Sequence, residues 1–224
     1  MFIGHLAVGF ASKRAAPRAG LAPLMAAPVL LDLVWPVLVL AGVEEVRIAP
    51  GITAASPLDF TWYPWSHSLA AALVWAALFG VAYLAVTRYR AGAIVVAAGV
   101  VSHWVLDLVS HRPDMPLWPG GPRYGLGLWY SLPATAVVEV ALFAGGVALY
   151  ATATRARNRT GAIALWALVA FAAAIYAVNA LGPPPPSARA VAWSALAQWL
   201  WIPWAALIDA NRAPLAPPAG APAA

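Results

Sequence analysis

Residues 102–114 read S-H-W-V-L-D-L-V-S-H-R-P-D, and the fold is organised around this stretch. It carries two of the four histidines in the chain and two of its eight acidic residues. His103, Asp107 and His111 stand at i, i+4 and i+8, a spacing that places side chains on one face of an α-helix. Because their neighbours are mostly Trp, Val and Leu, the stretch predicts a polar stripe inside an apolar helix. The function then depends on which other polar residues meet this stripe.

The composition is that of a membrane protein. Of the 224 residues, 63% are hydrophobic and 9% are charged, whereas roughly 25% charged residues are usual in a soluble domain. Long apolar stretches repeat along the whole chain, which predicts an all-α polytopic helical membrane protein. The net charge of +5 comes from basic residues in short connections, which indicates membrane orientation rather than a nucleic-acid partner. Because the chain has no cysteine, any metal ion must be held by His and carboxylate side chains.

The apolar stretches predict about six transmembrane helices preceded by a short N-terminal helix. Residues 1–12 are fewer than the roughly 20 needed to cross a bilayer, so we expect a re-entrant or packed helix there. The expected spans are residues 21–42, 66–86, 91–110, 129–151, 161–181 and 190–208. Residues 1–208 thus form a single membrane-embedded domain, and the Pro/Ala-rich residues 209–224 are expected to be a disordered tail.

The basic residues predict the orientation of these spans. With six spans, most of them fall on one side of the membrane: Lys13, Arg14, Arg18, Arg88, Arg90, Arg155, Arg157, Arg159 and Arg212. The positive-inside rule makes this the cytoplasmic side of a bacterial inner membrane. Loops 43–65, 111–128 and 182–189 then face outward. Arg112 and Arg123 lie in these outward loops but are outnumbered.

Ionisable residues inside spans are costly and usually face the bundle interior, where they pair or bind a ligand. Asp32, His103 and Glu139 lie at similar depths, roughly 10–15 Å below the outer surface at 1.5 Å per helical residue. His67 and His111 lie nearer that surface, with Asp107 between. His5 reaches the same level if residues 1–12 fold back on the first span. We therefore expect all four histidines and these acidic residues to meet in one outward-facing pocket.

Such a pocket has the ligands of a divalent metal site. Neutral imidazole and carboxylate bind Zn²⁺ well, and Mn²⁺ or another first-row ion is an alternative. Six residues are predicted to be ligands: His5, Asp32, His67, His103, Asp107 and His111. Their number allows one metal ion with supporting residues, or two ions. Glu139 or Asp114 is the expected catalytic base. Ser66 is predicted to cap the second span and to place His67 in its first turn.

Four short motifs resemble those of the bacterial inner-membrane metal-dependent hydrolase family, whose members include a LexA-regulated inner-membrane protein. They are G-H-L-A-V-G at 4–9, L-L-D-L at 30–33, W-S-H-S-L at 65–69 and S-H-W-V-L-D at 102–107. The resemblance spans roughly residues 1–115 and implies that His5, Asp32, His67, His103 and Asp107 hold the metal. The family pattern has a second Asp where Leu30 stands, and an H-R pair where this chain has T-W-Y-P-W before His67.

These observations predict a membrane-bound metal-dependent hydrolase that acts on a lipid-linked or phosphoester substrate reaching the site from the bilayer. Two alternatives come from other classes. One is a non-catalytic membrane protein in which a metal ion or a hydrogen-bond cluster holds helices together. The other is an ion or small-molecule transporter, which the nearly uniform Ala, Val and Leu content of the inner halves of the spans disfavours. Membrane lipids are the expected partners, and the oligomeric state is open.

Overall fold

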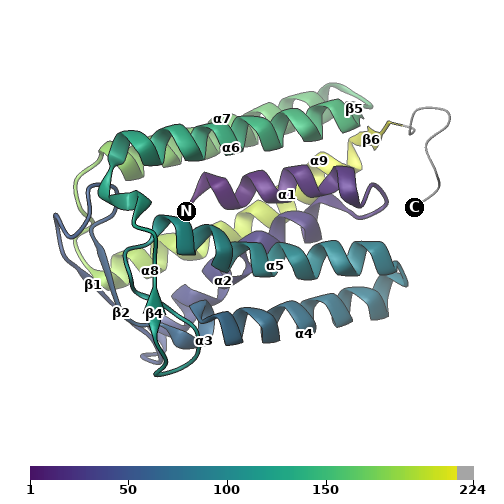
Figure 1. The fold of residues 1–224 in the computed structure, drawn as a ribbon. Coiled ribbons are helices and arrows are strands. Elements are labelled where there is room, and N and C mark those ends of the chain that lie inside the picture. The colour runs from purple at the N-terminus through teal and green to yellow at the C-terminus, as the bar shows by residue number, and fades with distance from the viewer. Residues whose placement is uncertain (216–224) are drawn as a thin grey trace.

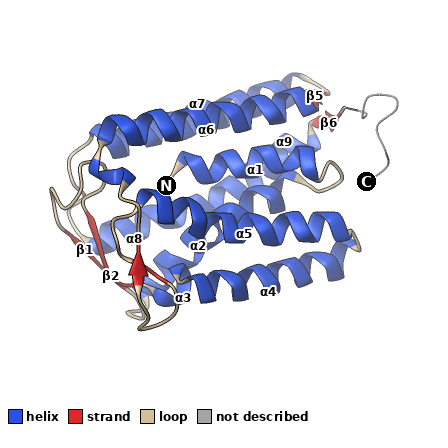
Figure 2. Cartoon of the chain, in the orientation of Figure 1, coloured by secondary structure: helices blue, strands red, loops and turns tan. Residues whose placement is uncertain are grey.

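The computed structural model describes residues 1–215 as a bundle of long helices with short strands at its two ends (Figures 1 and 2). The helices are α1 (Ile3–Ala15), α2 (Leu21–Leu40), α3 (Pro64–His67), α4 (Leu69–Thr87), α5 (Arg90–Ser110), α6 (Leu132–Ala153), α7 (Arg159–Leu181), α8 (Ala188–Leu196) and α9 (Trp201–Ala210). Short 3₁₀ turns are η1 (Leu128–Tyr130) and η2 (Ala197–Leu200). The strands are β1 (Glu45–Ile48), β2 (Leu58–Trp62), β3 (Met115–Pro116), β4 (Arg123–Tyr124), β5 (Thr154–Ala156) and β6 (Arg212–Pro214).

The polytopic all-α fold is confirmed. Within the described residues, six helical segments are long and apolar enough to cross a membrane. Five are single helices (α2, α4, α5, α6 and α7), and the sixth, Ala188–Ala210, combines α8, η2 and α9. The fourth span begins at Leu132 rather than Trp129, because Ser131 accepts the Ala134 N–H as its N-cap and Leu128–Tyr130 form a 3₁₀ turn.

Helix α1 lies inside the bundle and packs against α2, α5 and α6 (Figure 1). It ends at Ala15, three residues later than predicted, and so includes Lys13 and Arg14. Small residues allow its close packing: a side chain at Gly146 of α6 would collide with the backbone of Ala7, and one at Gly9 would meet Met25 of α2. At about 1.5 Å per residue the helix is too short to span a bilayer, so it acts as a packed core element.

The end of α5 is covered by loops that are more regular than the sequence indicated. Residues 43–65, predicted as a mixed loop, contain the antiparallel hairpin β1–β2, in which Val46 pairs with Phe60. Both of these side chains are buried, whereas the other residues of the two strands are partly or fully exposed. Strands β3 and β4 form a second short pair beside it (Figure 2). Together these hairpins close the bundle where the 102–114 stretch ends.

The opposite end of the bundle is closed by the antiparallel pair β5–β6. Helix α9 continues to Ala210, and Arg212 is buried against the Thr154 hydroxyl and carbonyl. The first residues of the predicted disordered tail 209–224 are therefore structured, because Arg212 has buried partners. Residues 216–224 of that tail lie outside the described residues.

Candidate metal centre

The 102–114 stretch forms the last turns of α5 and the residues just after it. His103 and Asp107 lie on the helix as predicted, and His111 is its C-cap, with its N–H donated to the Asp107 carbonyl. Gly99 lets α5 approach α2, since a Cβ there would lie 3.0 Å from the Ala27 Cβ. One turn later, His103 therefore reaches the backbone of α2.

Asp107 is the centre of the cluster. Its Oδ1 lies 3.0 Å from the His5 Nε2, and the amino group of Met1 also contacts this oxygen. Its Oδ2 lies 3.1 Å from the His103 Nε2, 3.6 Å from that of His111 and 3.9 Å from that of His67. The four imidazole rings thus present the same nitrogen to one carboxylate, although they come from α1, α3, α5 and the loop after α5. All five of these side chains are buried.

Asp32 completes the cluster from α2. Its Oδ1 lies 3.5 Å from the His67 Nε2 and 3.9 Å from the His103 Nε2. Its side chain is 22% exposed, whereas that of Asp107 is 4% exposed. The structure therefore brings together all six residues predicted as ligands, and Asp32 marks the side from which the cluster is reached.

In three of the four histidines, the Nδ1 atom lies within hydrogen-bond distance of an oxygen atom. The Nδ1 of His103 lies 2.8 Å from the Pro28 carbonyl, and that of His111 lies 2.9 Å from the Asp114 carboxylate. The Nδ1 of His67 lies 2.6 Å from the Ser66 hydroxyl. A carbonyl or carboxylate oxygen can only accept, so in His103 and His111 Nδ1 carries a proton, and in the neutral ring Nε2 presents its lone pair to the cluster. The Nδ1 of His5 has no hydrogen-bond partner among the described residues.

The predicted cap on the second span is wrong. Ser68, not Ser66, is the N-cap of α4, because its hydroxyl accepts the Ala71 N–H. His67 accordingly ends the short helix α3 instead of starting α4. The Ser66 hydroxyl is freed for the contact with the His67 ring.

Asp114 and Glu139, the two predicted bases, lie beside the cluster and make positioning contacts. Asp114 Oδ1 lies near the His111 Nδ1 and accepts from the Tyr63 hydroxyl at 3.2 Å, while Oδ2 accepts from the Arg112 Nε at 3.0 Å. Burial, followed by the charge of Asp114, raises the pKa of the Tyr63 phenol well above its ordinary value, so Tyr63 remains a donor. Glu139 accepts the backbone N–H groups of Phe2 at 2.7 Å and Gly4 at 3.2 Å, and so stabilises the start of α1.

The arrangement fits a divalent ion. Two groups of residues could each hold a metal ion: His5, His103 and Asp107, and Asp32, His67 and His103. Ligands at 2.0–2.1 Å in a tetrahedral zinc site are about 3.3 Å apart. The Nε2 atoms of His67 and His103 are 3.3 Å apart, and neither carries a proton if Nδ1 is the protonated nitrogen. Two lone pairs at this distance repel unless a cation lies between them. The donor set and its spacing therefore match Zn²⁺ or another first-row ion.

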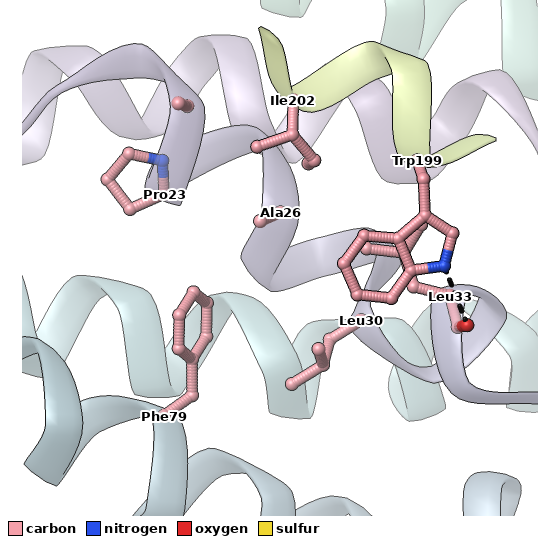
Figure 3. Close-up of a pocket in the computed structure, with 8 residues that line it drawn as sticks. Pro23, Ala26, Leu30, Leu33, Phe79, Trp199 and Ile202 are labelled. Carbon is pink, nitrogen blue, oxygen red and sulfur yellow. Dashed lines mark hydrogen bonds between the residues drawn. The ribbon is translucent and has the colours of Figure 1, made fainter. Parts of the chain in front are cut away.

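An apolar hollow of about 380 Å³ lies elsewhere, between α2, α4 and the η2–α9 segment (Figure 3). Its wall includes Leu30, Phe79 and Ile202, and the Trp199 indole N–H donates to the Leu33 carbonyl there at 3.2 Å. None of the cluster residues lines this hollow. It has no titratable group and is separate from the candidate metal centre.

The sequence did not identify Glu44, Ser66 and Tyr63 as partners of the histidines. Glu44 is one of two adjacent acidic residues in the loop after α2, and its neighbour Glu45 is exposed, so nothing local distinguishes the buried one. The adjacency of Ser66 to His67 was a usable signal, but the hydroxyl also suited a helix cap. Tyr63 belongs to an aromatic run that is typical of a membrane interface.

The fold and the cluster define a polytopic α-helical membrane protein with a buried group of four imidazoles and two carboxylates. The chain belongs to the YdjM inner membrane protein family, whose sequence pattern matches residues 1–182. This match covers every residue of the cluster and confirms a multi-pass inner-membrane protein. No curated protein and no solved structure gives a significant match.

Proposed function

We propose that the cluster is a divalent-metal centre and that the protein is a membrane-embedded metal-dependent hydrolase. The observation that carries this proposal is the pair of facing Nε2 atoms of His67 and His103, 3.3 Å apart. The Nδ1 of His103 is held by a carbonyl, and that of His67 by a hydroxyl. Asp32 and Asp107 supply the negative charge that a divalent ion requires at this depth.

The chain's own residues would have distinct tasks. His5, His103 and Asp107 would hold an ion in one group, and Asp32, His67 and His103 in the other. His111 belongs to neither group and would contact Asp107 through Nε2. A bound divalent ion supplies Lewis acidity that activates water and polarises an ester. Asp107 directs its two oxygens toward different histidines, so it is suited to joining the two groups of ligands if two ions bind. Asp114 and Glu139 would position His111 and α1, respectively.

The substrate class follows from where the centre lies. The histidines and Asp107 are buried among apolar membrane helices, and Asp32 is the more exposed carboxylate. A substrate with an apolar anchor would approach from the bilayer and present its ester group at Asp32. This supports a lipid-linked or phosphoester substrate. Arg112 is not free to hold an anionic group, because its guanidinium pairs with Asp59 and Asp114.

The second candidate is a cluster that only holds helices together. It is supported by the same facing nitrogens, because an added proton shared between His67 and His103 would also satisfy them. A transporter is disfavoured by the packing below the cluster. Leu6, Phe10, Phe143 and Val147 are buried in one apolar core that packs along α1, where an ion path would need polar side chains.

The hydrolase is tested with purified protein in detergent, loaded with Zn²⁺ or Mn²⁺ and assayed with p-nitrophenyl phosphate, bis-p-nitrophenyl phosphate and a short-chain lipid phosphoester in micelles. Hydrolysis that is removed by chelation and by Asp107→Asn, but kept by Glu45→Gln, is expected. Glu45 is a matched control because it is exposed and pairs with Arg47. A metal-loaded protein that hydrolyses none of these esters would favour the structural candidate instead.

We also propose that the cluster opens toward the outer side of the membrane. Hairpins β1–β2 and β3–β4 lie at the bundle end where α5 finishes, while the basic turns lie at the other end (Figure 1). The positive-inside rule assigns the basic end to the cytoplasm. Reporters inserted after residues 50 and 120 should give external signals, and a reporter after residue 157 should give a cytoplasmic one. Cytoplasmic signals at residues 50 and 120 would reverse the orientation.

A further inference from the structure

Glu44 is a buried carboxylate outside the group of predicted ligands. It lies in the turn between α2 and β1 and is 4% exposed. Its Oε1 accepts the backbone N–H groups of Trp65 and Ser66, each at 2.8 Å, and its Oε2 accepts the Ser66 hydroxyl at 2.6 Å. Burying a carboxylate is costly unless its oxygens are hydrogen-bonded. Here the three donors all come from α3, the short helix that carries His67.

The hydrogen bonds at Ser66 have a defined direction. A hydroxyl has one proton, and the Ser66 hydroxyl gives it to Glu44. The same oxygen lies 2.6 Å from the His67 Nδ1. Because its proton is already used, the Ser66 oxygen can only accept from His67. The Nδ1 of His67 must therefore carry a proton, and in the neutral ring its Nε2 is left bare toward Asp32 and His103.

We propose that Glu44 is a positioning residue for the metal centre: through Ser66 it sets the tautomer of His67 so that Nε2 is the ligand atom. This inference rests on the proposed metal centre for its purpose, but the tautomer itself does not depend on a bound ion. The order of the three groups also matters. The hydroxyl lies between the carboxylate and the imidazole, so this is not the arrangement that activates a serine nucleophile, in which the imidazole lies in the middle.

The substitution Glu44→Gln tests this role because it changes polarity with little change of shape. The two backbone N–H groups require an acceptor, so the oxygen of the new side-chain amide takes the place of Oε1 and its NH₂ group faces Ser66. Ser66 then accepts from the amide and turns its own proton toward His67. The His67 proton moves to Nε2, which is the wrong nitrogen for the metal. A role limited to packing would be little affected by this substitution.

The first measurement is the ¹⁵N NMR spectrum of metal-free protein with labelled histidines. The His67 signals are assigned from their loss in His67→Gln. Wild type and the control Glu45→Gln are expected to show the Nδ1–H tautomer of His67, and Glu44→Gln the Nε2–H tautomer. Ser66→Ala, which keeps the backbone bonds of residues 65 and 66 to Glu44, should give a mixture, and Ser66→Thr should restore the wild-type spectrum.

The second measurement is Zn²⁺ affinity by chelator competition. Loss of a residue that orients a metal-binding histidine typically weakens binding about 10–100-fold. Glu44→Gln and Ser66→Ala should fall in this range, whereas Ser66→Thr and Glu45→Gln should bind as wild type does. If Glu44→Gln and Ser66→Ala keep both the Nδ1–H tautomer and wild-type affinity, the positioning role is overturned and the metal centre stands. If wild type binds no Zn²⁺, the proposed function fails, while the spectra still decide the tautomer.

Discussion

The two ends of α1 carry buried polar groups of different kinds. At one end, Lys13 donates to the Asp209 carboxylate at 2.8 Å and to the Ala19 carbonyl at 2.6 Å, so its charge and its hydrogen bonds are matched. At the other end, His5 belongs to a cluster of imidazoles and carboxylates that is rich in acceptors. A matched pair needs nothing further to be stable. In the cluster the Met1 amino group contacts one oxygen of Asp107, and the other carboxylate oxygens and ring nitrogens remain available to a further cation. The difference separates a structural contact from a candidate ligand site.

The largest effect is expected at Asp107, because its two oxygens face histidines from four parts of the fold. Asp107→Asn keeps the shape and removes the charge. Zn²⁺ affinity should fall by more than ~100-fold, since loss of even an outer partner costs about 10–100-fold. Chelator competition measures the affinity. Lys13→Met is the matched control at the other end of α1, and equal losses in both variants would contradict the distinction between the two ends.

Metal removal is expected to affect stability only through the cluster. An ion present at about 100 times its dissociation constant stabilises the folded state by about 2.7 kcal/mol. Adding EDTA to metal-loaded protein should therefore lower Tm by several degrees in wild type and in Lys13→Met. It should leave Tm unchanged in His103→Ala. Thermal unfolding followed by tryptophan fluorescence gives the comparison, and an EDTA shift of equal size in His103→Ala would show that the ion acts elsewhere.

The Lys13–Asp209 ion pair, at the end of α1 away from the cluster, should lose different amounts of stability when either partner is replaced. The Lys13 side chain is 4% exposed and that of Asp209 is 30% exposed. Asp209→Asn leaves a buried ammonium short of a partner and should lower the free energy of unfolding by about 2–3 kcal/mol. Lys13→Met leaves a carboxylate that water can reach, so its cost should be about 1 kcal/mol. Denaturation in mixed micelles measures both, and the reverse order would mean that burial does not govern this pair.

The smallest effect is expected from Tyr63→Phe, which removes one hydrogen bond to Asp114 at 3.2 Å. Asp114 keeps its contacts with His111 and Arg112, so the variant should lose about 0.5–1.5 kcal/mol of stability. Zn²⁺ affinity should change no more than a few-fold. A loss as large as that of Asp107→Asn would place Tyr63 among the residues that control the ion.

The spans could be predicted from the sequence because each depends on local hydropathy. The interruption of the last span at residues 197–200 was not predicted, although Pro203 in the first turn of α9 marks it, because proline has no N–H to donate to the Trp199 carbonyl. Hairpin β1–β2 was missed because its register depends on the packing of Val46 against residues far along the chain. Such contacts arise from the tertiary fold and leave no periodic signal.

The members of the candidate site could be predicted because ionisable residues inside apolar spans must find partners. Depth along each span brought Asp32 and His103 to similar levels, with His67 nearer the surface, and the structure places all three together. Their role as metal ligands stays a prediction. Glu44 was not predictable, because its burial depends on how the turn after α2 meets α3. The orientation of each histidine likewise follows from contacts such as the Pro28 carbonyl.

The metal content of purified protein is the sharpest test of the candidate metal centre. Wild type and His103→Ala are purified side by side in detergent without added metal, and bound metals are measured by inductively coupled plasma mass spectrometry. Matched elution profiles show that both variants are folded. Wild type should carry a first-row divalent ion in near-stoichiometric amount, and His103→Ala should have lost it. Wild-type protein that remains free of divalent metal, even after incubation with Zn²⁺ or Mn²⁺, would contradict the metal centre.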